Sequence, residues 1–385
     1  MSVFGTRPEA VKMCPLIKEL ETRSGMENIV CITGQHHDMV YPVLRLFDVK
    51  PDIDLDIMRR QQTLTSITTD VLTRMEGVLA QNRPDIVLVH GDTTTSFAAA
   101  LAAFYQQIPV GHVEAGLRTY NRYSPFPEEM NRNLTGKLAQ LHFAPTLKNK
   151  RNLEAEGIRD QIFVTGNTVI DAFKTTLCEN YVFHEEKLRD LVSFTGRIIL
   201  LTAHRRENLG ESLEHICRSA KRIAETFPEC RIIYPLHLNP AVRRTAEEIL
   251  RGVSNVILTE PLDVQDMHNL TARSYLVMTD SGGLQEEAPS CGIPVLVLRS
   301  ETERPEAVEA GTVRVVGTEE NDIYDNACRL LTDSAAYNRM AGAVNPYGDG
   351  RASRRIADIL CAWEKEGCRW RKEKEENREC ANMGN

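Results

Sequence analysis

The sequence predicts an α/β protein made of two Rossmann-like domains, each with a doubly wound parallel sheet. Short runs of apolar and β-branched residues alternate with longer helical patterns nearly from end to end of the chain. Runs that are apolar throughout are typical of parallel strands covered by helices on both faces. The runs fall into two sets of about six, and 385 residues are too many for one ordinary core. Two domains in series are therefore expected.

The predicted strands divide the chain near residues 166–176. The first set is Ser2–Phe4, Ile29–Thr33, Ile86–His90, Val110–Val113, Leu141–Ala144 and Ile162–Thr165. The second set is Ile198–Thr202, Arg231–Pro235, Asn255–Leu258, Tyr275–Thr279, Val295–Leu298 and Val313–Val316. Helical patterns lie between them at Thr63–Gln81, Thr95–Tyr105, Leu213–Thr226, Ala241–Leu250 and Asp322–Leu331. We expect an N-terminal domain of residues 1–168, a C-terminal domain of residues 169–352, and a last helix at about 353–385 that packs back onto the first domain.

The charge balance and the cysteine pattern argue against several classes of function. With 46 basic and 54 acidic residues the net charge is −8, so a basic face for nucleic acid is not expected. No stretch approaches the roughly 20 apolar residues of a membrane span, and no signal peptide opens the chain, which predicts a cytoplasmic protein without a membrane partner. The ten cysteines show no C-x-x-C spacing, so we expect buried free thiols.

Polar and glycine-rich clusters follow many of the predicted strands. In an open parallel sheet, ligands bind beyond the carboxyl ends of the strands, so these clusters are the candidate site. A single Asp or Ser in such a place is usually a helix cap, but several clusters together favour a lined cleft. The clusters are Gly5–Glu9, Gly34–Asp38, His90–Thr95, Glu114–Arg118, His204–Asn208 and Asp280–Gly283.

A phosphate site is predicted at Asp280-Ser281-Gly282-Gly283, a turn that opens a helix. Glycines let the backbone approach a ligand, and the free N–H groups of a first helical turn suit an anion. The motif matches neither G-x-G-x-x-G nor the P-loop, so NAD and ATP are not supported and no cofactor is expected. Positive charge for a diphosphate is available from five side chains: Arg7, Lys12, His204, Arg205 and Arg206. Arg205 and Arg206 could instead be solvated surface charges, and His204 could be a core or capping histidine.

Three acids in the first half are candidates for proton transfer: Asp92, Glu114 and Glu128. Asp92 and Glu114 follow strands that we expect to be neighbours, so their carboxylates can converge. Burial and the proximity of like charges raise the pKa of one such acid, which lets one donate a proton while the other accepts. Glu128 follows Pro127 at a predicted helix start, where an acid is equally an ordinary N-terminal signal.

Sequence blocks that run in order from residue 4 to about residue 355 carry a family resemblance. They are GTRPEA at 5–10, HGDTTT at 90–95, HVEAGLR at 112–118, TGNTVID at 165–171, HRREN at 204–208, HLNP at 237–240, DSGG with QEE at 280–287, and TERPE at 302–306. Together they resemble the non-hydrolysing UDP-N-acetylglucosamine 2-epimerases of bacteria. The resemblance implies a glycosyltransferase-B-like fold with the active site in the interdomain cleft, a homodimer, and no metal or cofactor.

The resemblance also implies a reaction and a set of site residues. The reaction is reversible epimerisation of UDP-GlcNAc to UDP-ManNAc at C2, by elimination of UDP to a 2-acetamidoglucal and re-addition, a step of polysaccharide biosynthesis. The implied catalytic positions are Asp92, Glu114, Glu128 and His204, with their individual roles left open. The implied substrate positions are Arg7, Lys12, Arg118, Asn167, Arg205, Ser281, Gly282, Gly283, Arg304 and Glu287, the last accepting both ribose hydroxyls.

Bacterial members of this family often carry a second, activating UDP-GlcNAc site. Gln35, His36 and His237 match parts of it. Gln61 stands where an arginine is frequent, and Asp38 stands where Gln or Glu is frequent. Because glutamine lacks the bidentate fork of arginine for phosphate, activation by substrate stays an open question for this chain.

Three other functions remain as alternatives. A hydrolysing epimerase would release ManNAc and UDP, and only its products tell it apart. A retaining UDP-sugar glycosyltransferase would share the fold but would not need three acids in the first domain. A non-catalytic regulator that binds a nucleotide sugar would need none of the three carboxylates, yet all are present.

Overall fold

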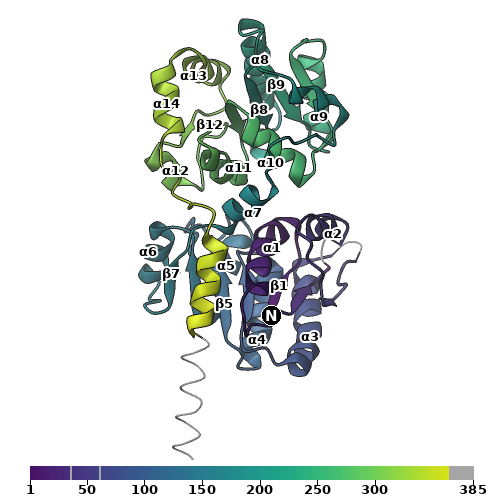
Figure 1. The fold of residues 1–385 in the computed structure, drawn as a ribbon, viewed down its shortest axis with the longest axis vertical. Helices are drawn as coiled ribbons and strands as arrows, with labels where there is room; N and C mark the ends of the chain where they lie inside the picture. The colour runs from purple at the N-terminus through teal and green to yellow at the C-terminus, as the bar shows by residue number, and fades with distance from the viewer. Residues whose placement is uncertain (35–36, 60–61, 364–385) are drawn as a thin grey trace, which may run out of the picture. The chain divides into compact units, whose positions relative to one another are not determined.

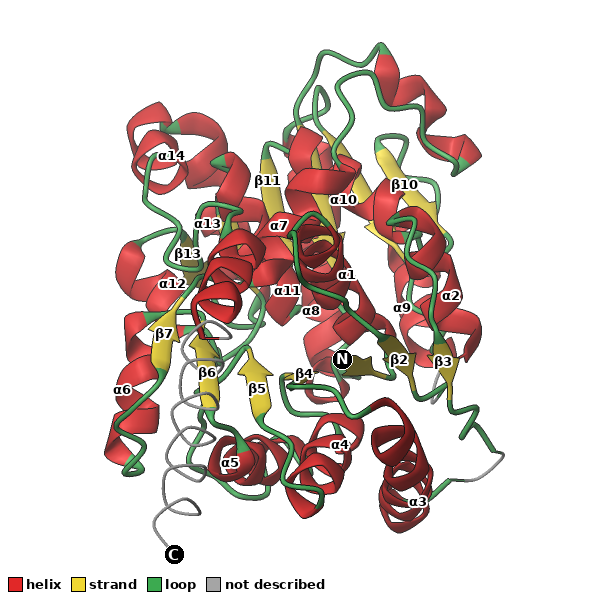
Figure 2. Ribbon diagram, turned by 60° about the horizontal axis from the view of Figure 1, so that its bottom comes forward, coloured by secondary structure: helices red, strands yellow, loops and turns green. Residues whose placement is uncertain are grey.

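The computed structural model describes residues 1–34, 37–59 and 62–363, and the chain divides into two compact units (Figures 1 and 2). Unit 1 comprises Met1–Asp171 and Gly350–Asn385, and unit 2 comprises Ala172–Asp349. The first boundary, expected after residue 168, falls after Asp171, and the second, expected after residue 352, falls after Asp349. Each unit is a parallel sheet with covering helices, as predicted.

Unit 1 contains a seven-stranded parallel sheet with the order β3-β2-β1-β4-β5-β6-β7. Its strands are β1 (Ser2–Phe4), β2 (Val30–Ile32), β3 (Ile53–Asp54), β4 (Val87–His90), β5 (Val110–Val113), β6 (Leu141–Ala144) and β7 (Ile162–Val164). The sequence predicted six strands and missed β3. This edge strand has two residues, neither fully buried, and therefore lacks an apolar run.

Helices cover both faces of this sheet (Figure 1). On one face, Val71, Met75 and Ala99 of α3 and α4 pack with strand residues such as Val3 and Val89. The opposite face carries α1 and α2, which contact each other. The helices of unit 1, together with α7 at its boundary, are α1 (Arg7–Glu21), α2 (His37–Leu46), α3 (Leu64–Asn82), α4 (Thr94–Tyr105), α5 (Glu128–Leu138), α6 (Leu147–Ala155) and α7 (Thr168–Thr176).

The described part of the last helix, residues 352–363, belongs to unit 1. The carboxylate of Asp171 accepts hydrogen bonds from the backbone N–H groups of Ala352 (3.1 Å) and Ser353 (2.8 Å), which caps the start of this helix. Arg355 donates to the carbonyl oxygen of Thr165 at 3.1 Å. These contacts return the chain to unit 1 after it has formed unit 2.

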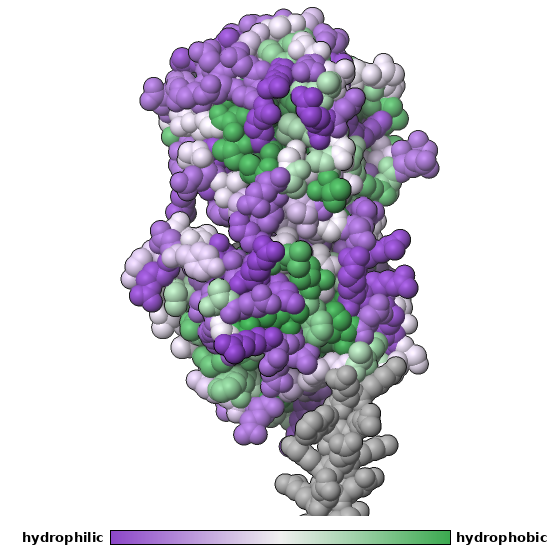
Figure 3. Space-filling view, turned by 90° about the vertical axis from the view of Figure 1, so that its left-hand side faces the viewer, coloured by the Kyte–Doolittle hydropathy of each residue, from purple (hydrophilic) through white to green (hydrophobic). Residues whose placement is uncertain are grey.

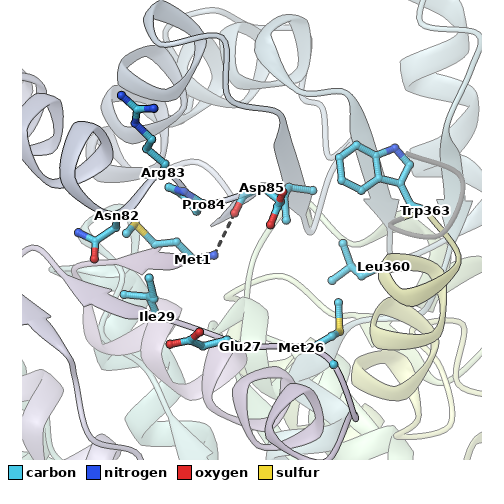
Figure 4. Close-up of a pocket in the computed structure, with 12 residues that line it drawn as sticks. Met1, Met26, Glu27, Ile29, Asn82, Arg83, Pro84, Asp85, Leu360 and Trp363 are labelled. Carbon is cyan, nitrogen blue, oxygen red and sulfur yellow. Dashed lines mark hydrogen bonds between the residues drawn. The ribbon is translucent and has the colours of Figure 1, made fainter. Parts of the chain in front are cut away.

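A hollow of about 350 Å³ lies at the amino ends of the central strands of unit 1 (Figure 4). Met1, Ile29, Ile86, Leu360 and Trp363 are among its lining residues, and the Met1 amine donates to the carbonyl oxygen of Ile86 at 2.9 Å. Ligands of parallel sheets bind at the opposite, carboxyl edge. This hollow is therefore distinct from the predicted site.

Unit 2 contains a six-stranded parallel sheet with the order β10-β9-β8-β11-β12-β13. Its strands are β8 (Ile198–Thr202), β9 (Arg231–Pro235), β10 (Val256–Thr259), β11 (Leu276–Thr279), β12 (Val295–Val297) and β13 (Val313–Val315). Every one of them overlaps a predicted strand. The sheet order reverses between β8 and β11, which is where doubly wound sheets place a ligand.

The core of unit 2 forms where α8 (Glu211–Thr226), α9 (Pro240–Leu250) and α13 (Glu320–Thr332) pack on the sheet. In α8, the buried residues Leu213, Ile216, Cys217, Ala220 and Ile223 recur at helical spacing and form one apolar face. The remaining helices are α10 (Val264–Arg273), α11 (Gly282–Glu287), α12 (Pro305–Ala310) and α14 (Ser334–Ala341), with 3₁₀ turns at Glu186–Val192, Arg206–Asn208 and Ala288–Cys291.

The surface shown in Figure 3 is mainly hydrophilic, with apolar areas on both units. Among the helices of the described residues, none has the length and apolar character needed to span a membrane. The expectation that the cysteines are buried is wrong for Cys178 and Cys291, which are exposed because they lie just after α7 and at the end of a 3₁₀ turn.

Candidate functional site

Asp92 and Glu114 leave the sheet of unit 1 from neighbouring strands. β4 and β5 pair in register, with His90 opposite Val113, so the residues that follow them emerge together. Gly91 has a φ of +62°, and a Cβ on it would lie 3.1 Å from Oε2 of Glu114. Glycine thus allows both the left-handed turn and the close approach of the carboxylate.

Two side chains of α5 contact Asp92. The Arg132 guanidinium contacts Oδ2 of Asp92, and Nδ2 of Asn131 donates to its carbonyl oxygen at 3.0 Å. Burial raises the pKa of Asp92 above its usual value; Arg132 opposes this effect and the charge of Glu114 adds to it. An acid with a raised pKa can release and recover a proton nearer to neutral pH, as proton transfer requires.

Glu114 has a backbone conformation that is rare for its residue type. Its φ of +62° lies in the left-handed region, which costs about 1–2 kcal/mol for a residue with a Cβ. Nearby contacts hold it there: Lys12 pairs with Oε1, and Nδ2 of Asn167 donates to the same oxygen at 2.9 Å. Strain of this kind, sustained by surrounding contacts, is typical of functional positions.

His90 lies against the same carboxylate. Its ring is buried (3% exposed), and its Nε2 is 3.8 Å from Oε2 of Glu114. Burial lowers the pKa of His90 to about 4, so the ring is neutral at pH 7. The sequence placed His90 in the HGDTTT motif but assigned it no role.

Glu9 joins two of the loops that form this edge of the sheet. Its buried carboxylate accepts hydrogen bonds from the backbone N–H groups of Gly5 (3.1 Å) and Thr6 (2.8 Å) after β1. The hydroxyl groups of Thr93 (2.7 Å) and Ser96 (2.9 Å), after β4, donate to its other oxygen. The residues directly before Arg7 and directly after Asp92 therefore share one anchor.

Glu128, the third predicted acid, is half-buried and begins α5. Its neighbour Glu129 is buried and accepts from the backbone N–H groups of Thr119 (3.1 Å) and Tyr120 (3.0 Å). Of the two adjacent acids, Glu129 thus fixes the loop before α5, whereas the side chain of Glu128 has no such bond to the described residues. A catalytic role of Glu128 stays a prediction.

Of the other positions predicted in unit 1, Arg118 has a strong structural partner. It forms a bidentate pair with Glu156, Nε to Oε1 at 2.6 Å and Nη2 to Oε2 at 2.8 Å. This pair engages the fork that would otherwise bind a phosphate, and a role of Arg118 in substrate binding stays a prediction. Arg7 is the first residue of α1, directly after the N-cap Thr6.

In unit 2, His204 follows β8 and is fixed by Asp280, which follows β11. Nδ1 of His204 lies 3.1 Å from Oδ1 of Asp280, and the two strands are paired. His237 stacks on the ring of His204, with centroids 5.3 Å apart and planes 19° apart. Burial lowers the pKa of His237, and the charge of His204 lowers it further. His237, predicted as part of an activating site, therefore contacts a predicted catalytic residue directly.

Two guanidinium groups converge at Gly282, the first residue of α11. A Cβ on Gly282 would lie 3.7 Å from Nη2 of Arg304 and 4.0 Å from Nη2 of Arg205. Both side chains are also paired with acids, Arg304 with Glu286 and Arg205 with Glu303 at 3.9 Å. Of the five side chains predicted to supply positive charge for a diphosphate, Arg205 thus lies at the DSGG turn, whereas Lys12 pairs with Glu114 in unit 1.

Glu287, at the end of α11, is 9% exposed and lies close to the same turn. A Cβ on Gly283 would be 3.4 Å from its Oε1. Nε2 of His268 lies 4.0 Å from Oε2. A buried carboxylate in this position can accept hydrogen bonds from hydroxyl groups such as those of a ribose.

Three predicted positions of the activating site, Gln35, His36 and Gln61, lie outside the described residues. The sequence assigned no role to Glu9, Arg132 or Asp280, although each now contacts or orients a candidate residue. One signal for Arg132 was available: it lies one helical turn after Glu128 in a predicted helix.

The chain is similar to known proteins along most of its length. A family model described as UDP-N-acetylglucosamine 2-epimerase matches residues 18–361. The UDP-N-acetylglucosamine 2-epimerase of Bacillus subtilis is 55% identical over 361 residues, covering 94% of this chain and 94% of the relative. The structure of the Neisseria meningitidis UDP-GlcNAc 2-epimerase bound to UDP-GlcNAc is 49% identical, with a TM-score of 0.84, and covers 94% of this chain and 99% of that one. S. aureus MnaA with UDP is 48% identical, with a TM-score of 0.86 and coverages of 95% and 96%.

Proposed function

The protein belongs to the UDP-N-acetylglucosamine 2-epimerase family, and we propose that it interconverts UDP-GlcNAc and UDP-ManNAc without hydrolysis. The observation that carries this proposal is the pair Asp92 and Glu114. Two carboxylates emerge from neighbouring strands, one with a raised pKa and one paired with an ammonium group. Such a pair can remove a proton from carbon and return one.

The chemical difficulty is the weakly acidic hydrogen at C2. In the proposed reaction a carboxylate removes this proton, the C2–H electron pair forms the C1=C2 double bond, and the C1–O electron pair leaves with UDP. The products of this half-reaction are 2-acetamidoglucal and UDP. Re-addition of UDP at C1, with a proton delivered to the opposite face of C2, gives the epimer. Atoms and charge balance over the cycle, and no cofactor takes part.

Within unit 1, the contacts favour different tasks for the two acids. Glu114, paired with Lys12, is present as a carboxylate, which is the form that a base needs. Asp92, with its raised pKa, is the better proton donor. Glu128, with no such partner recorded, is assigned to assistance at the 3-hydroxyl. Arg7, Arg118 and Asn167 remain predicted substrate contacts.

Within unit 2, the DSGG turn is the proposed UDP site. Arg205 and Arg304 converge on Gly282, and His204 follows the adjacent strand β8. We assign the diphosphate to these groups together with Ser281 and Gly283, and the ribose hydroxyls to Glu287. UDP has to be retained while the glucal is free, and several charged contacts to the diphosphate serve this purpose.

We further propose that the enzyme is a cytoplasmic homodimer that serves polysaccharide biosynthesis. One observation supports self-association: Phe104 and Tyr105, at the end of α4, are 56% and 69% exposed. Large exposed aromatic side chains are enriched in protein interfaces. Light scattering of the purified chain measures its mass, and a mass of one chain would contradict the dimer.

Product analysis tests the proposed function. UDP-GlcNAc incubated with the protein should become a mixture of two UDP-sugars, measured by ¹H and ³¹P NMR, and UDP-ManNAc as starting material should reach the same mixture. Free ManNAc and UDP as the sole products would indicate a hydrolysing epimerase. Turnover that requires a sugar acceptor would indicate a glycosyltransferase, and binding without turnover would indicate a regulator.

A further inference from the structure

Asp280 has two carboxylate oxygens with different partners. The residue is fully buried (0% exposed). Oδ2 accepts from the backbone N–H groups of His204 (2.7 Å) and Arg205 (2.8 Å) and from Nδ2 of Asn208 (3.1 Å). Oδ1 lies 3.1 Å from Nδ1 of His204, but among the described residues it accepts no hydrogen bond, so it is a buried oxygen without a donor. A proton on Nδ1 is within reach of this oxygen and can satisfy it after a small rotation of the ring.

This arrangement determines which nitrogen of His204 is available for chemistry. An ionised carboxylate oxygen is an acceptor only, so the neighbouring Oδ1 favours the tautomer of His204 that carries its proton on Nδ1. His237 covers one face of the ring by stacking. The side chain of His204 is nevertheless 37% exposed. Nε2, on the far side of the ring from Nδ1, is left to act on a ligand.

We propose that Asp280 is a positioning residue that keeps Nδ1 of His204 protonated. Nε2 of His204 can then donate a proton to UDP and accept it again. This inference rests on the proposed function and deepens it. As the C1–O bond breaks, its electron pair stays on the UDP oxygen, and the Nε2 proton of the imidazolium passes to that oxygen. The ring is then neutral, with its proton on Nδ1. On re-addition Nε2 recovers the proton.

The charged groups around His204 agree with this role. The carboxylate of Asp280 lies on its Nδ1 side, with Oδ1 at 3.1 Å. Burial favours the neutral form of the stacked His237 and lowers its pKa, so this ring adds no fixed positive charge. Arg205, the next residue in the chain, is paired with Glu303 at 3.9 Å. Asp280 is thus the negative group in direct contact with the ring.

The variant Asp280→Asn tests the proposal because its effect on the tautomer can be predicted. The side-chain oxygen of Asn can accept from the donors that now reach Oδ2, which places its NH₂ group against Nδ1. Nδ1 then has to accept, and the ring becomes a neutral Nε2–H tautomer. This tautomer still donates one hydrogen bond to a phosphate but cannot both give and recover a proton. We expect kcat to fall roughly 10²- to 10⁴-fold, with the Kd of UDP changed only a few-fold.

Asp266→Asn is the matched control. Asp266 is also buried in unit 2 (2% exposed), and it also accepts from two consecutive backbone N–H groups, those of His184 and Glu185, both at 2.9 Å. It does not contact His204 in any recorded bond. We expect this variant to lose thermal stability and to keep the kcat of its folded fraction. A kcat loss equal to that of Asp280→Asn would show that the effect is one of folding alone.

Two further measurements make the test independent of how well Asp280→Asn folds. In the ¹⁵N-histidine NMR spectrum of the wild-type protein above pH 8, His204, assigned by its loss in His204→Gln, should show a protonated Nδ1; a protonated Nε2 would overturn the proposal. In the His204→Gln background, adding Asp280→Asn should lower kcat no further, and an undiminished second loss would also overturn it. A wild-type protein that does not epimerise UDP-GlcNAc would instead contradict the proposed function, whatever the NMR result.

Discussion

Lys12 of α1 and Glu114 at the end of β5, separated by 102 residues of sequence, form an ion pair whose side chains are only 17% and 9% exposed. The backbone of Glu114 lies in the left-handed region, with a φ of +62°. Replacing either residue by an uncharged one would leave the charge of the other nearly buried and unpaired. The resulting loss of folding stability is larger than that from breaking an ion pair on the surface. The ion pair therefore contributes both to the stability of unit 1 and to the charge state of Glu114, the candidate base.

Lys12→Met should lower kcat by about 10- to 100-fold, because Glu114 loses the ammonium that keeps it ionised. The matched control is Lys18→Met on the same helix, where the lysine pairs with Glu21 at 2.7 Å and is 40% exposed. This control should be within about twofold of wild type, since exposed pairs contribute little. Steady-state kinetics of both variants decide the matter, and equal activities would contradict the role of Lys12.

Asp92→Asn should abolish most turnover while UDP still binds, because an amide cannot carry the transferred proton and the proposed UDP contacts lie in unit 2. Isothermal titration calorimetry gives the Kd of UDP, and the rate of epimer formation gives kcat. Asp70→Asn, which removes a surface partner of Arg59, is the control for a lost carboxylate in unit 1. Parallel losses of UDP binding and turnover in Asp92→Asn would indicate a structural role.

Gly116→Ala should destabilise unit 1 by at least about 2 kcal/mol. Its φ is +89°, and a Cβ would meet the carbonyl oxygen of Asn149 at 2.3 Å. Gly25→Ala is the control for backbone strain alone, because φ is +85° and nothing lies within 4 Å of the added atom. We expect about 1–2 kcal/mol there. Urea denaturation measures the free energy of unfolding of both variants. Equal losses would show that the close approach of Asn149 to Gly116 adds no cost beyond backbone strain.

The pH dependence of unfolding should report on Asp280. Burial alone would raise the pKa of this carboxyl group, but the hydrogen bond and charge of His204 and the N–H donors hold it below its usual value of 3.8. A lowered pKa in the folded state contributes stability that is full above pH 3.8 and is lost as the pH falls through the folded value. Asp280→Asn lacks this contribution. Its deficit in melting temperature should therefore be largest near neutral pH and shrink below pH 3.8; a constant deficit would argue against an ionised Asp280.

The strand ends of this molecule were predictable because buried parallel strands are rich in apolar and β-branched residues. Runs such as Val87–His90 and Val110–Val113 are rich in valine and contain no Asp, Glu, Lys or Arg, so the acids that follow them, Asp92 and Glu114, could be assigned to one edge of a sheet. The two-residue strand β3 has no such run and could not be found this way. A short edge strand depends on its neighbour more than on its own sequence.

The partners of the site residues were not predictable, since they come from distant parts of the chain. Nothing in the spacing of Arg118 and Glu156 indicates that they form a bidentate pair. The adjacent acids Glu128 and Glu129 carry the same charge, and only the loop that folds onto Glu129 distinguishes them. The left-handed φ of Glu114 is likewise a result of tertiary contacts, because its residue type disfavours that conformation.

Deuterium exchange at C2 is the most direct measurement of the central claim, that carboxylates of this protein remove and return a carbon-bound proton. UDP-GlcNAc incubated with the wild-type protein in D₂O should give UDP-GlcNAc and UDP-ManNAc that both carry deuterium at C2, seen as loss of the H2 signal in ¹H NMR and as a gain of one mass unit. Asp92→Asn should suppress the exchange. Epimers that form without deuterium at C2 would contradict the account, as would recovery of unlabelled UDP-GlcNAc from an enzyme that still binds UDP.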